Sequence, residues 1–250
     1  MPDPRLYIED ALHEGAQLSL DDGQSRKLTS VLRLGPGSGV RVFNEEGEWR
    51  AIIAAASKKG VTVEIGAQSR QARRAPDLDL LFAPVKRDAT DLVVEKATEL
   101  GVRRIRPVIT ARTIADTVRL DRLSLIARSA AEQTERFDIP EIAPPLPLIK
   151  ALDGWEEARA LIYADEAGEV WGGEKARDIA RALAALNADA PLAVLIGPEG
   201  GFTPEERTLL RSKRCVIPVS LGPRILRAET AAIATLAVVQ ALVGDWRRGA

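Results

Sequence analysis

The chain has 250 residues, of which 46% are hydrophobic and 28% are charged, and its formal net charge is −1. This composition is that of a folded soluble protein and excludes an intrinsically disordered chain, and the length is sufficient for two domains of ordinary size. The near-zero net charge excludes an overall field that would draw the molecule onto nucleic acid or an anionic membrane. Any contact with RNA must therefore use local basic patches.

Cys215 and His13 are the single cysteine and the single histidine of the chain. One cysteine forms no intramolecular disulfide and supplies no paired thiolates for a zinc site, and we expect no metal and a reducing compartment. His13 lies in an ordinary polar stretch, which favours a solvated surface residue over a catalytic imidazole. The sequence has neither a secretory signal nor a run of about 20 apolar residues, which predicts a cytoplasmic protein without a membrane span. Catalysis would then use carboxylates, arginines, backbone amides or a cofactor.

Short β-rich runs separated by turn signals occupy the first 65 residues. Asn44–Gly47 and Lys58–Gly60 are typical of hairpin turns, because their glycines accept a positive φ. Gly35–Gly39 has the wrong spacing for a dinucleotide loop, and we interpret it as a turn. These signals predict a small β-barrel, with strands at residues 5–8, 40–43, 49–53 and 61–65.

One helix is predicted to interrupt these strands, at residues 22–34. Leu28, Val31 and Leu32 share a face of this helix at three- and four-residue spacing, which predicts that this face is buried.

A polar, basic stretch at residues 68–76 has no apolar period and ends in a proline, which predicts a domain boundary. We place the first domain at residues 1–72 and the second at residues 73–250. In the second, apolar runs alternate with helices, which indicates an α/β domain with a largely parallel sheet. Its strands are predicted at residues 78–82, 105–109, 160–164, 192–196 and 215–219.

In the second domain, helices are predicted at residues 88–100, 121–136 and 229–243. Gly101 follows the first of them and is expected to form a left-handed C-terminal cap. The last helix is apolar around nearly its whole circumference and is therefore expected to be buried on all sides. Its outer face could be covered by a partner subunit, or it could be a central core helix; the pattern leaves both open.

The segment Leu195–Glu206 follows an apolar strand and opens a helix. Its glycines at 197, 200 and 201 would let backbone groups approach a ligand closely, and Thr203–Glu206 is a strong helix start. Ligands of α/β proteins bind at the carboxyl ends of strands. Glu199 would repel a phosphate, so the loop suits a neutral or cationic ligand better. A simple tight turn is the plainer interpretation.

A second segment, Leu221–Ala231, also lies between an apolar strand and a helix. Its plainer interpretation is a loop capped by Glu229 or Thr230, with Arg224 and Arg227 solvated or paired with nearby acids. That interpretation accounts for the cap but not for both arginines.

The two segments together resemble the RsmE family of the SPOUT methyltransferases. The resemblance is carried by Ile196-Gly197-Pro198-Glu199-Gly200-Gly201 and by Leu221-Gly222-Pro223-Arg224-Ile225-Leu226-Arg227-Ala228-Glu229-Thr230-Ala231. It extends upstream to Glu95–Val102, Glu132–Arg136 and Ile139–Ile142, and to Val31–Leu34 in the predicted barrel. It therefore covers nearly the whole chain.

This resemblance implies an α/β methyltransferase domain of the SPOUT type, with a deep trefoil knot that binds S-adenosylmethionine, behind an N-terminal PUA-like β-barrel for RNA. It implies a homodimer, formed through the C-terminal domain, that methylates N3 of a uridine in 16S rRNA of the small ribosomal subunit. Periodicity alone predicts a plain, doubly wound sheet without a knot.

The two loops and the arginines between them suggest a mechanism and its candidate site residues. Arg227 would stabilise the negative charge that spreads onto the uracil carbonyl oxygens when N3 loses its proton, and Glu229 would orient Arg227 or accept the proton. The expected cofactor-binding residues are Leu195, Ile196, Gly197, Pro198, Glu199, Gly200, Gly201, Leu221, Gly222, Ile225, Leu226, Thr230 and Ala231.

Basic residues from both predicted domains are candidates for contacts with RNA phosphates. They are Arg5, Lys27, Arg33, Lys86 and Arg136, with Arg87 and Arg112 as weaker candidates. Two positions depart from the family pattern, since Glu135 and Asp138 stand where a glycine and a second basic residue are expected. An acid beside Arg136 should repel phosphate.

Three other functions are compatible with parts of this pattern. A SPOUT enzyme could act on tRNA or on a ribose 2′-hydroxyl, and a non-catalytic RNA-binding or assembly factor could retain the pocket without using it. A dinucleotide oxidoreductase is a weaker choice, because no Gly-x-Gly-x-x-Gly follows a first strand.

Overall fold

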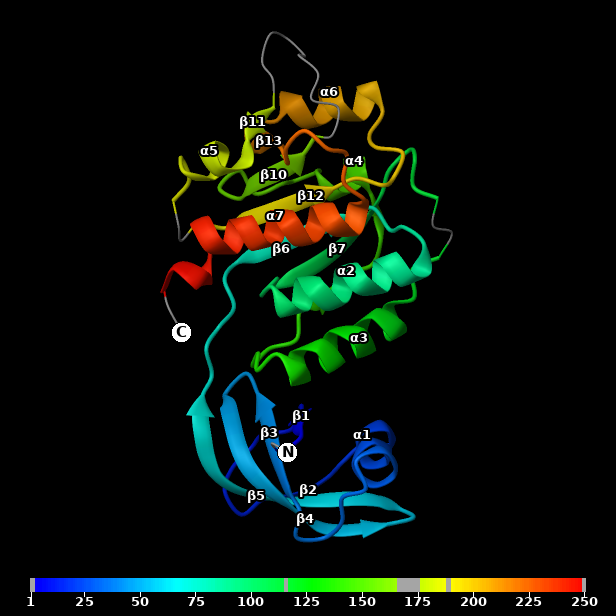
Figure 1. Cartoon of the computed structure of the whole chain (residues 1–250), viewed down its shortest axis with the longest axis vertical. Coiled ribbons are helices and arrows are strands. Elements are labelled where there is room, and N and C mark those ends of the chain that lie inside the picture. Colours follow the sequence, from blue (N-terminus) through cyan, green and yellow to red (C-terminus); the bar gives the residue numbers. More distant parts are fainter. Residues whose placement is uncertain (1–2, 115–116, 166–175, 188–189, 249–250) are drawn as a thin grey trace. The chain divides into compact units, whose positions relative to one another are not determined.

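The computed structural model describes residues 3–114, 117–165, 176–187 and 190–248 (Figure 1). The chain divides into two compact units. The N-terminal unit comprises Met1–Arg74 and Ala131–Asp138, and the C-terminal unit comprises Ala75–Ala130 and Ile139–Ala250. It stays a prediction that the N-terminal unit binds RNA and that the C-terminal unit binds the cofactor and forms the dimer.

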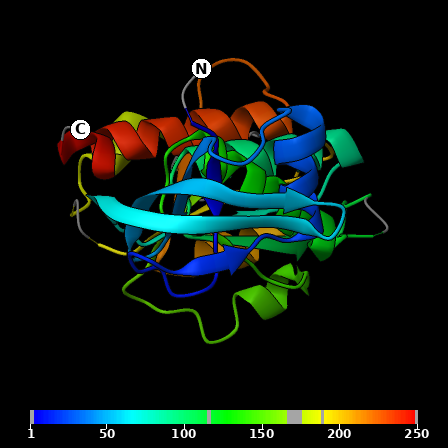
Figure 2. The same cartoon turned by 90° about the horizontal axis from the view of Figure 1, so that it is seen from below.

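The N-terminal unit is built on a five-stranded sheet in the order β1-β3-β4-β5-β2. The strands are β1 (Arg5–Tyr7), β2 (Gln17–Ser19), β3 (Gly39–Asn44), β4 (Gly47–Ser57) and β5 (Gly60–Gln71). Strands β3, β4 and β5 form two successive antiparallel hairpins, as predicted, and Figure 2 shows the long β4–β5 pair. The short strand β2 was not predicted.

Strand β5 is also longer than predicted, and Gln68–Gln71 belong to it rather than to a linker. Gln71 pairs with Gly47 of β4, because backbone pairing continues past the last buried side chain, Ile65. The apolar period ends before the strand does. The core of the unit lies on the other part of these strands, where Val61, Val63 and Ile65 alternate with exposed or half-exposed residues.

The predicted helix at residues 22–34 is shorter and changes pitch. Helix α1 (Asp22–Arg26) begins with a capping box between Asp21 and Gln24, and a π-helical turn, η1 (Lys27–Val31), follows it directly. The wider turn rotates the later side chains away from the core, so Leu28 is fully buried but Val31 is 71% exposed. The prediction that Val31 and Leu32 share the buried face is therefore wrong.

A buried charge cluster joins residues 131–138 to the sheet of the N-terminal unit. Arg5 Nε donates to Glu48 Oε2 at 2.5 Å, and Arg70 donates to the same carboxylate at 2.8 Å. Glu135 accepts from Arg70 at 2.7 Å and from Arg41 at 3.3 Å. Glu135 has a φ of +60°, which a side chain adopts at a cost. Its two arginine partners offset that cost.

This cluster predicts a loss of stability in acid. Burial alone would raise the pKa of Glu48, but hydrogen bonds from Arg70 and Arg5 outweigh it and lower the pKa; Arg70 and Arg41 also lower the pKa of Glu135. A lowered carboxylate pKa contributes stability above the unfolded value of about 4.3, and that contribution is lost as the pH falls through the folded value. We expect the midpoint of urea unfolding of the N-terminal unit to lie at a lower urea concentration at about pH 4 and below than at pH 7. Glu135→Gln should lower stability at pH 7 and weaken this pH dependence; an unchanged dependence would contradict the assignment to Glu135.

The C-terminal unit is built on a parallel sheet whose main path runs in the order β11-β13-β10-β12-β6-β7-β8. All of its strand pairs in the described part are parallel, as predicted. The strands are β6 (Leu78–Phe82), β7 (Arg104–Ile109), β8 (Glu141–Ile142), β10 (Ala160–Ala164), β11 (Arg177–Asp178), β12 (Leu192–Ile196) and β13 (Val216–Ser220), with β9 (Leu146–Pro147) beside β7.

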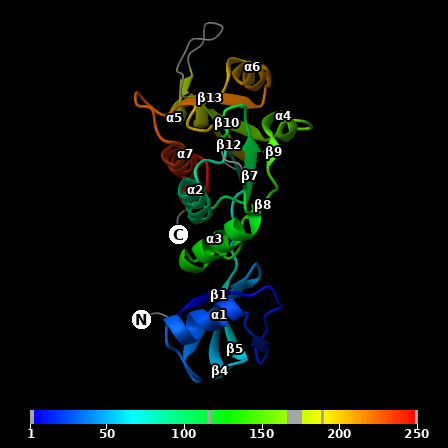
Figure 3. The same ribbon diagram turned by 90° about the vertical axis from the view of Figure 1, so that its right-hand side faces the viewer.

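Helices cover both faces of this sheet (Figures 1 and 3). One layer contains α2 (Arg87–Glu99), α3 (Leu120–Gln133), α5 (Ile179–Leu183) and α7 (Ala228–Leu242); the other contains α4 (Leu148–Ala151) and α6 (Pro204–Ser212); η2 (Asp245–Arg248) follows α7. Successive strand residues alternate between the layers, as Val194 and Leu195 of β12 do. Both faces are therefore apolar, which accounts for the continuous apolar runs. Gly101 has a φ of +76° and caps α2 as predicted.

Helix α7 is buried on one side only in the single chain. Ala232, Leu236 and Val239 lie in the core, whereas Ala241 and Leu242 are exposed. The alternative of a central core helix is therefore wrong, because the helix lies in the outer layer rather than between two layers, and coverage of its outer face by a partner subunit stays a prediction. By length and composition residues 228–247 could also cross a membrane, but the inner face is packed in the core as in a soluble protein. The trefoil knot stays a prediction.

Candidate active site

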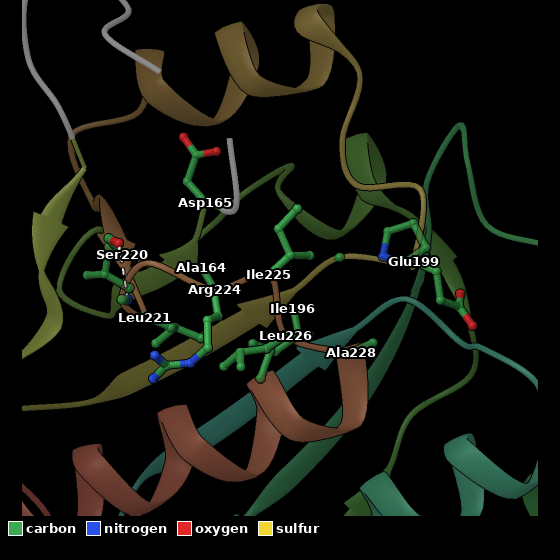
Figure 4. Close-up of a pocket in the computed structure, with 15 residues that line it drawn as sticks. Ala164, Asp165, Ile196, Glu199, Ser220, Leu221, Arg224, Ile225, Leu226 and Ala228 are labelled. Atoms are coloured by element: carbon green, nitrogen blue, oxygen red, sulfur yellow. Dashed lines mark hydrogen bonds between the residues drawn. The ribbon is translucent and has the colours of Figure 1, made fainter. Parts of the chain in front are cut away.

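A pocket opens at the carboxyl ends of β10, β12 and β13 (Figure 4). This is the edge at which ligands of parallel α/β sheets bind. Strand β10 lies between β12 and β13, so the loops that follow β12 and β13 reach the same pocket. Its lining residues are Ala164, Asp165, Ile196, Gly197, Pro198, Glu199, Val219, Ser220, Leu221, Gly222, Arg224, Ile225, Leu226, Ala228 and Ala231.

Most of the predicted cofactor residues line this pocket. Those that do are Ile196, Gly197, Pro198, Glu199, Leu221, Gly222, Ile225, Leu226 and Ala231. Four do not: Leu195 is buried in the opposite layer, Gly201 closes a turn by donating to Pro198 O at 2.8 Å, Gly200 is exposed, and Thr230 is exposed on α7. The structure therefore brings the two glycine-bearing loops together, and the binding of a cofactor by them stays a prediction.

Asp165 is the pocket residue whose chemistry sequence reasoning missed. It follows β10, a strand without a glycine motif, and only the sheet order places it beside the other two loops. Its side chain is fully buried, Arg211 of α6 donates to it, and Arg207 Nε lies 3.9 Å from its other oxygen. The carboxylate is thus held by the arginines of α6 and turned towards that helix (Figure 4), so Asp165 lines the pocket without presenting its charge to a ligand. An apolar strand that ends in Asp was the available signal.

The remaining pocket residues are predominantly apolar. Ile196, Val219 and Ala228 are buried, whereas the Ile225 side chain is 86% exposed at the opening. Gly222 has a φ of +102°, a conformation that side chains rarely adopt, so the loop after β13 requires glycine there. The pocket therefore combines a dry floor with the polar backbone groups of its loops. This combination suits a largely apolar ligand that carries a few polar groups.

Gly197 is required by packing. A Cβ at this position would lie 2.6 Å from Phe202 Cε2, and Phe202 is itself buried edge-on against Tyr163, with ring centroids 5.2 Å apart. The close approach that the sequence predicted for a ligand is therefore made by an aromatic ring of the same chain. Phe202 thereby packs against the loop that follows β12 and fixes its position.

We expect Gly197→Ala to destabilise the C-terminal unit by about 1–3 kcal/mol, because the added methyl displaces a packed aromatic ring. The same variant should bind the pocket's ligand more weakly. Thermal unfolding and calorimetry measure the two effects. Gly35→Ala is the matched control, since a Cβ there meets nothing within 4 Å. Combining Gly197→Ala with Phe202→Leu should recover part of the loss; strictly additive effects would show that Phe202 is not the cause.

The predicted catalytic residues lie at the start of α7. Arg227 is the N-cap residue of this helix, makes no side-chain capping hydrogen bond, and is exposed. It stands between Leu226 and Ala228, which both line the pocket. Glu229 lies in the first turn and is half-buried. The backbone of Arg227 is therefore held at the pocket while its guanidinium is open to solvent, and the catalytic roles stay predictions.

Two of the predicted RNA contacts are wrong, because the side chains are engaged inside the N-terminal unit. Arg5 is 4% exposed, pairs with Glu48, and stacks over the Phe43 ring at 3.4 Å. The Arg136 side chain is 7% exposed and donates to both carboxylate oxygens of Asp138, at 2.9 and 2.8 Å. Neither guanidinium is available to a phosphate. Asp138 was expected to repel phosphate beside Arg136. The structure shows instead that it forms a direct ion pair with Arg136.

The other predicted RNA contacts are more accessible. Arg33 is exposed and has a φ of +56°. Lys27 is partly exposed and pairs with Glu132 at 2.6 Å, and Lys86 is exposed at the N-terminus of α2. Arg87 is exposed too, and Arg112 donates to Gly200 O at 2.7 Å. Their contacts with RNA stay predictions. Among the residues that the structure describes, no group of three or more His, Cys, Asp or Glu side chains is placed to hold a metal ion.

Known proteins match the chain over both units. Residues 73–240 match the RNA methyltransferase domain family, and residues 20–66 match the RNA methyltransferase PUA domain family. A ribosomal RNA small subunit methyltransferase E from Rickettsia conorii is 32% identical over 240 residues, which are 95% of each chain.

Solved structures are similar over nearly the whole chain. A methyltransferase from Legionella pneumophila in complex with the cofactor SAM has a TM-score of 0.84 and 31% identity, over 98% of this chain and 100% of that one. A ribosomal RNA small subunit methyltransferase E from Neisseria gonorrhoeae bound to S-adenosyl methionine has a TM-score of 0.83 and 29% identity, over 98% and 99%. The likeness includes the N-terminal unit as well as the parallel sheet.

Proposed function

Since the chain belongs to the RNA methyltransferase family of ribosomal RNA small subunit methyltransferase E, we propose that it methylates N3 of a specific uridine in 16S rRNA. It is an S-adenosylmethionine-dependent rRNA methyltransferase with a PUA-like N-terminal unit. We propose uridine as the methylated base, N3 as the methylated atom, and the roles of the individual site residues. The observation that carries the proposal is the convergence of the two glycine-bearing loops on one pocket.

The residues of this pocket fit S-adenosylmethionine. Ile196, Leu226 and Ala231 offer apolar surface for the adenine ring, and the backbone of the loops after β12 and β13 offers donors and acceptors to its edge. Asp165, whose side chain is fully buried and paired with Arg211 of α6, would hold the end of β10 in place at the pocket wall. When bound, this cofactor supplies an activated methyl group and its own leaving group.

The chemistry that the protein must add is at the uracil. N3 carries a proton, and once that proton leaves, negative charge spreads onto the flanking carbonyl oxygens. Arg227 is placed at the pocket with a side chain free to turn towards the substrate, and its guanidinium would stabilise that charge. Glu229, two residues further on, would hold Arg227 or accept the proton.

The substrate strand must present the base unpaired. N3 lies in the base-pairing edge, so the nucleotide has to be single-stranded or extruded before the methyl group can reach it. Basic residues outside the pocket would hold the strand through its phosphates, with Lys27, Arg33 and Lys86 as the accessible candidates.

A homodimer accounts for the open side of α7. Ala241 and Leu242 are exposed on a helix whose other side is packed in the core. A two-fold copy of the same surface would cover them. Small ribosomal subunits are cytoplasmic, which places the proposed activity in that compartment.

The test is a methylation assay on small subunits from cells that lack this gene, with the product nucleoside identified by mass spectrometry. We expect 3-methyluridine at one position of 16S rRNA, formed only when S-adenosylmethionine is present. A ribose-methylated nucleoside or a methylated tRNA would assign a different substrate. No product together with no calorimetric binding of S-adenosylmethionine would leave a non-catalytic RNA-binding protein.

A further inference from the structure

A second cavity lies beside the cofactor pocket on the same edge of the sheet. It has a volume of about 330 Å³, within the range of small-ligand pockets. Pro84 and Val85 of its wall follow β6 directly, and β6 pairs with β12 in parallel, with Phe82 opposite Ile196. Ala83 N donates to Ile196 O at 2.9 Å, so the loop after β6 starts where the cofactor pocket begins. Apart from Lys86, the site proposed above uses no residue of this cavity.

Four basic side chains line this cavity. Lys86, Arg87 and Arg119 are exposed, and Arg122 is partly exposed. In the described part of the chain, Lys86 and Arg87 form no ion pair, whereas Arg119 pairs with Asp121 and Arg122 with Asp91. The Arg119 pair is fully on the surface, where an ion pair contributes little and is readily exchanged.

In the described part of the chain, the acidic groups around the cavity are fewer than the basic ones. Among the residues that the structure describes, Asp91 is the single carboxylate that lines it, and its charge is engaged by Arg122. Asp88 and Asp121 flank it on α2 and α3. The rim therefore keeps a positive excess that favours an anionic ligand.

The wall of the cavity is apolar and preformed. Val85, Val118 and Leu123 line it, together with Ile114, whose side chain is 75% exposed. Thr90 fixes the turn between β6 and α2. Its hydroxyl accepts a hydrogen bond from Val85 N at 3.1 Å and donates one to Val85 O at 3.0 Å. An exposed isoleucine beside unpaired cations is suited to a ligand with both a flat apolar part and a charged part.

We propose that this cavity binds one unpaired nucleotide of the substrate RNA, next to the nucleotide that is methylated. Its base would lie against Ile114 and Val118, and its phosphates would contact Lys86, Arg87 and Arg119. Single-stranded RNA is recognised in this way, by apolar contact with splayed bases and by basic contacts with the backbone. The inference rests on the proposed function, since it takes the substrate to be RNA, and it assigns that RNA a second point of attachment.

Occupancy can be measured without relying on turnover. Ile114→Cys introduces a thiol into the cavity, and its rate of alkylation by N-ethylmaleimide is followed by peptide mass spectrometry with and without a saturating single-stranded oligouridylate. We expect RNA to slow this alkylation at least tenfold. Ile149→Cys is the matched control, because Ile149 is an exposed isoleucine on α4, in the other helix layer, and its alkylation should not change.

The charged rim is tested by the salt dependence of binding. Lys86→Ala/Arg87→Ala should weaken binding of the same oligouridylate and reduce the slope of log affinity against log salt by about 1.4, at roughly 0.7 per phosphate contact in a single strand. Arg214→Ala removes one exposed positive charge at the amino end of β13 and should leave both unchanged. Binding of S-adenosylmethionine, measured by calorimetry, should be equal in all variants.

The outcomes separate this inference from the function on which it rests. Protection of the thiol with a reduced salt slope supports the nucleotide site. A reduced slope without protection means that the basic residues hold RNA outside the cavity, and overturns it. If small subunits are methylated normally but neither effect is found, the cavity inference fails and the proposed function stands; absence of methylation by the unaltered enzyme overturns the proposed function instead.

Discussion

Replacing Glu48 by alanine is expected to destabilise the N-terminal unit by about 3–5 kcal/mol, the cost of leaving a buried charge without its partner. Glu48 is 2% exposed and accepts from Arg5 and Arg70. Arg5 is buried too, so its guanidinium would remain in the core with no carboxylate beside it. The loss should therefore far exceed that of a surface ion pair.

Hydrogen exchange resolves this effect by unit. In Glu48→Ala, backbone amides of β3, β4 and β5 should exchange much faster, whereas those of β6 and β12 should keep their protection. Glu64→Gln is the control, because Glu64 is an exposed carboxylate of β5. A variant that removes the charge from both sides, Arg5→Met/Glu48→Met, should recover a large part of the stability, since no isolated charge is left. If Glu48→Ala behaves like Glu64→Gln, the cluster contributes little to stability.

Arg227→Ala is expected to lower turnover by about 10²- to 10³-fold, the usual effect of removing one group that stabilises negative charge in the transition state. The side chain is exposed and outside the pocket lining, whereas its neighbours Leu226 and Ala228 form part of that lining. Affinity for S-adenosylmethionine should therefore be unchanged. Arg227→Lys should recover only part of the rate, because a lysine keeps the charge but loses the two-pronged geometry of the guanidinium.

Single-turnover methylation of small subunits, with cofactor affinity measured in parallel, separates chemistry from binding. Arg181→Ala removes another exposed arginine of the same unit, on α5, and should leave the rate unchanged. A normal rate in Arg227→Ala would remove this residue from the mechanism. A normal rate per bound cofactor together with weaker cofactor binding would reassign Arg227 to the pocket.

Much of the fold could be predicted because the relevant signals are local. Predicted strands at residues 78–82, 160–164 and 192–196 coincide with β6, β10 and β12. The cap at Gly101 and the helix start at Thr203 were correct as well, since each depends on a few neighbouring residues. The prediction of a helix at residues 22–34 is wrong from Lys27 onwards, where the helix changes pitch. An argument from the spacing of apolar residues assumes a constant α-helical turn.

The sequence by itself determined the apolar strands, the two glycine-bearing loops and the family, because these are written in consecutive residues. Only the tertiary structure decided which distant side chains meet. It placed Asp165 in the pocket through the order of the strands, and it buried Arg5 against Glu48, 43 residues away. It also left one side of α7 open. Contacts of this kind depend on the order of the strands in the sheet and on which charged side chains are buried together. Neither property can be recognised from the hydrophobic periodicity of the sequence.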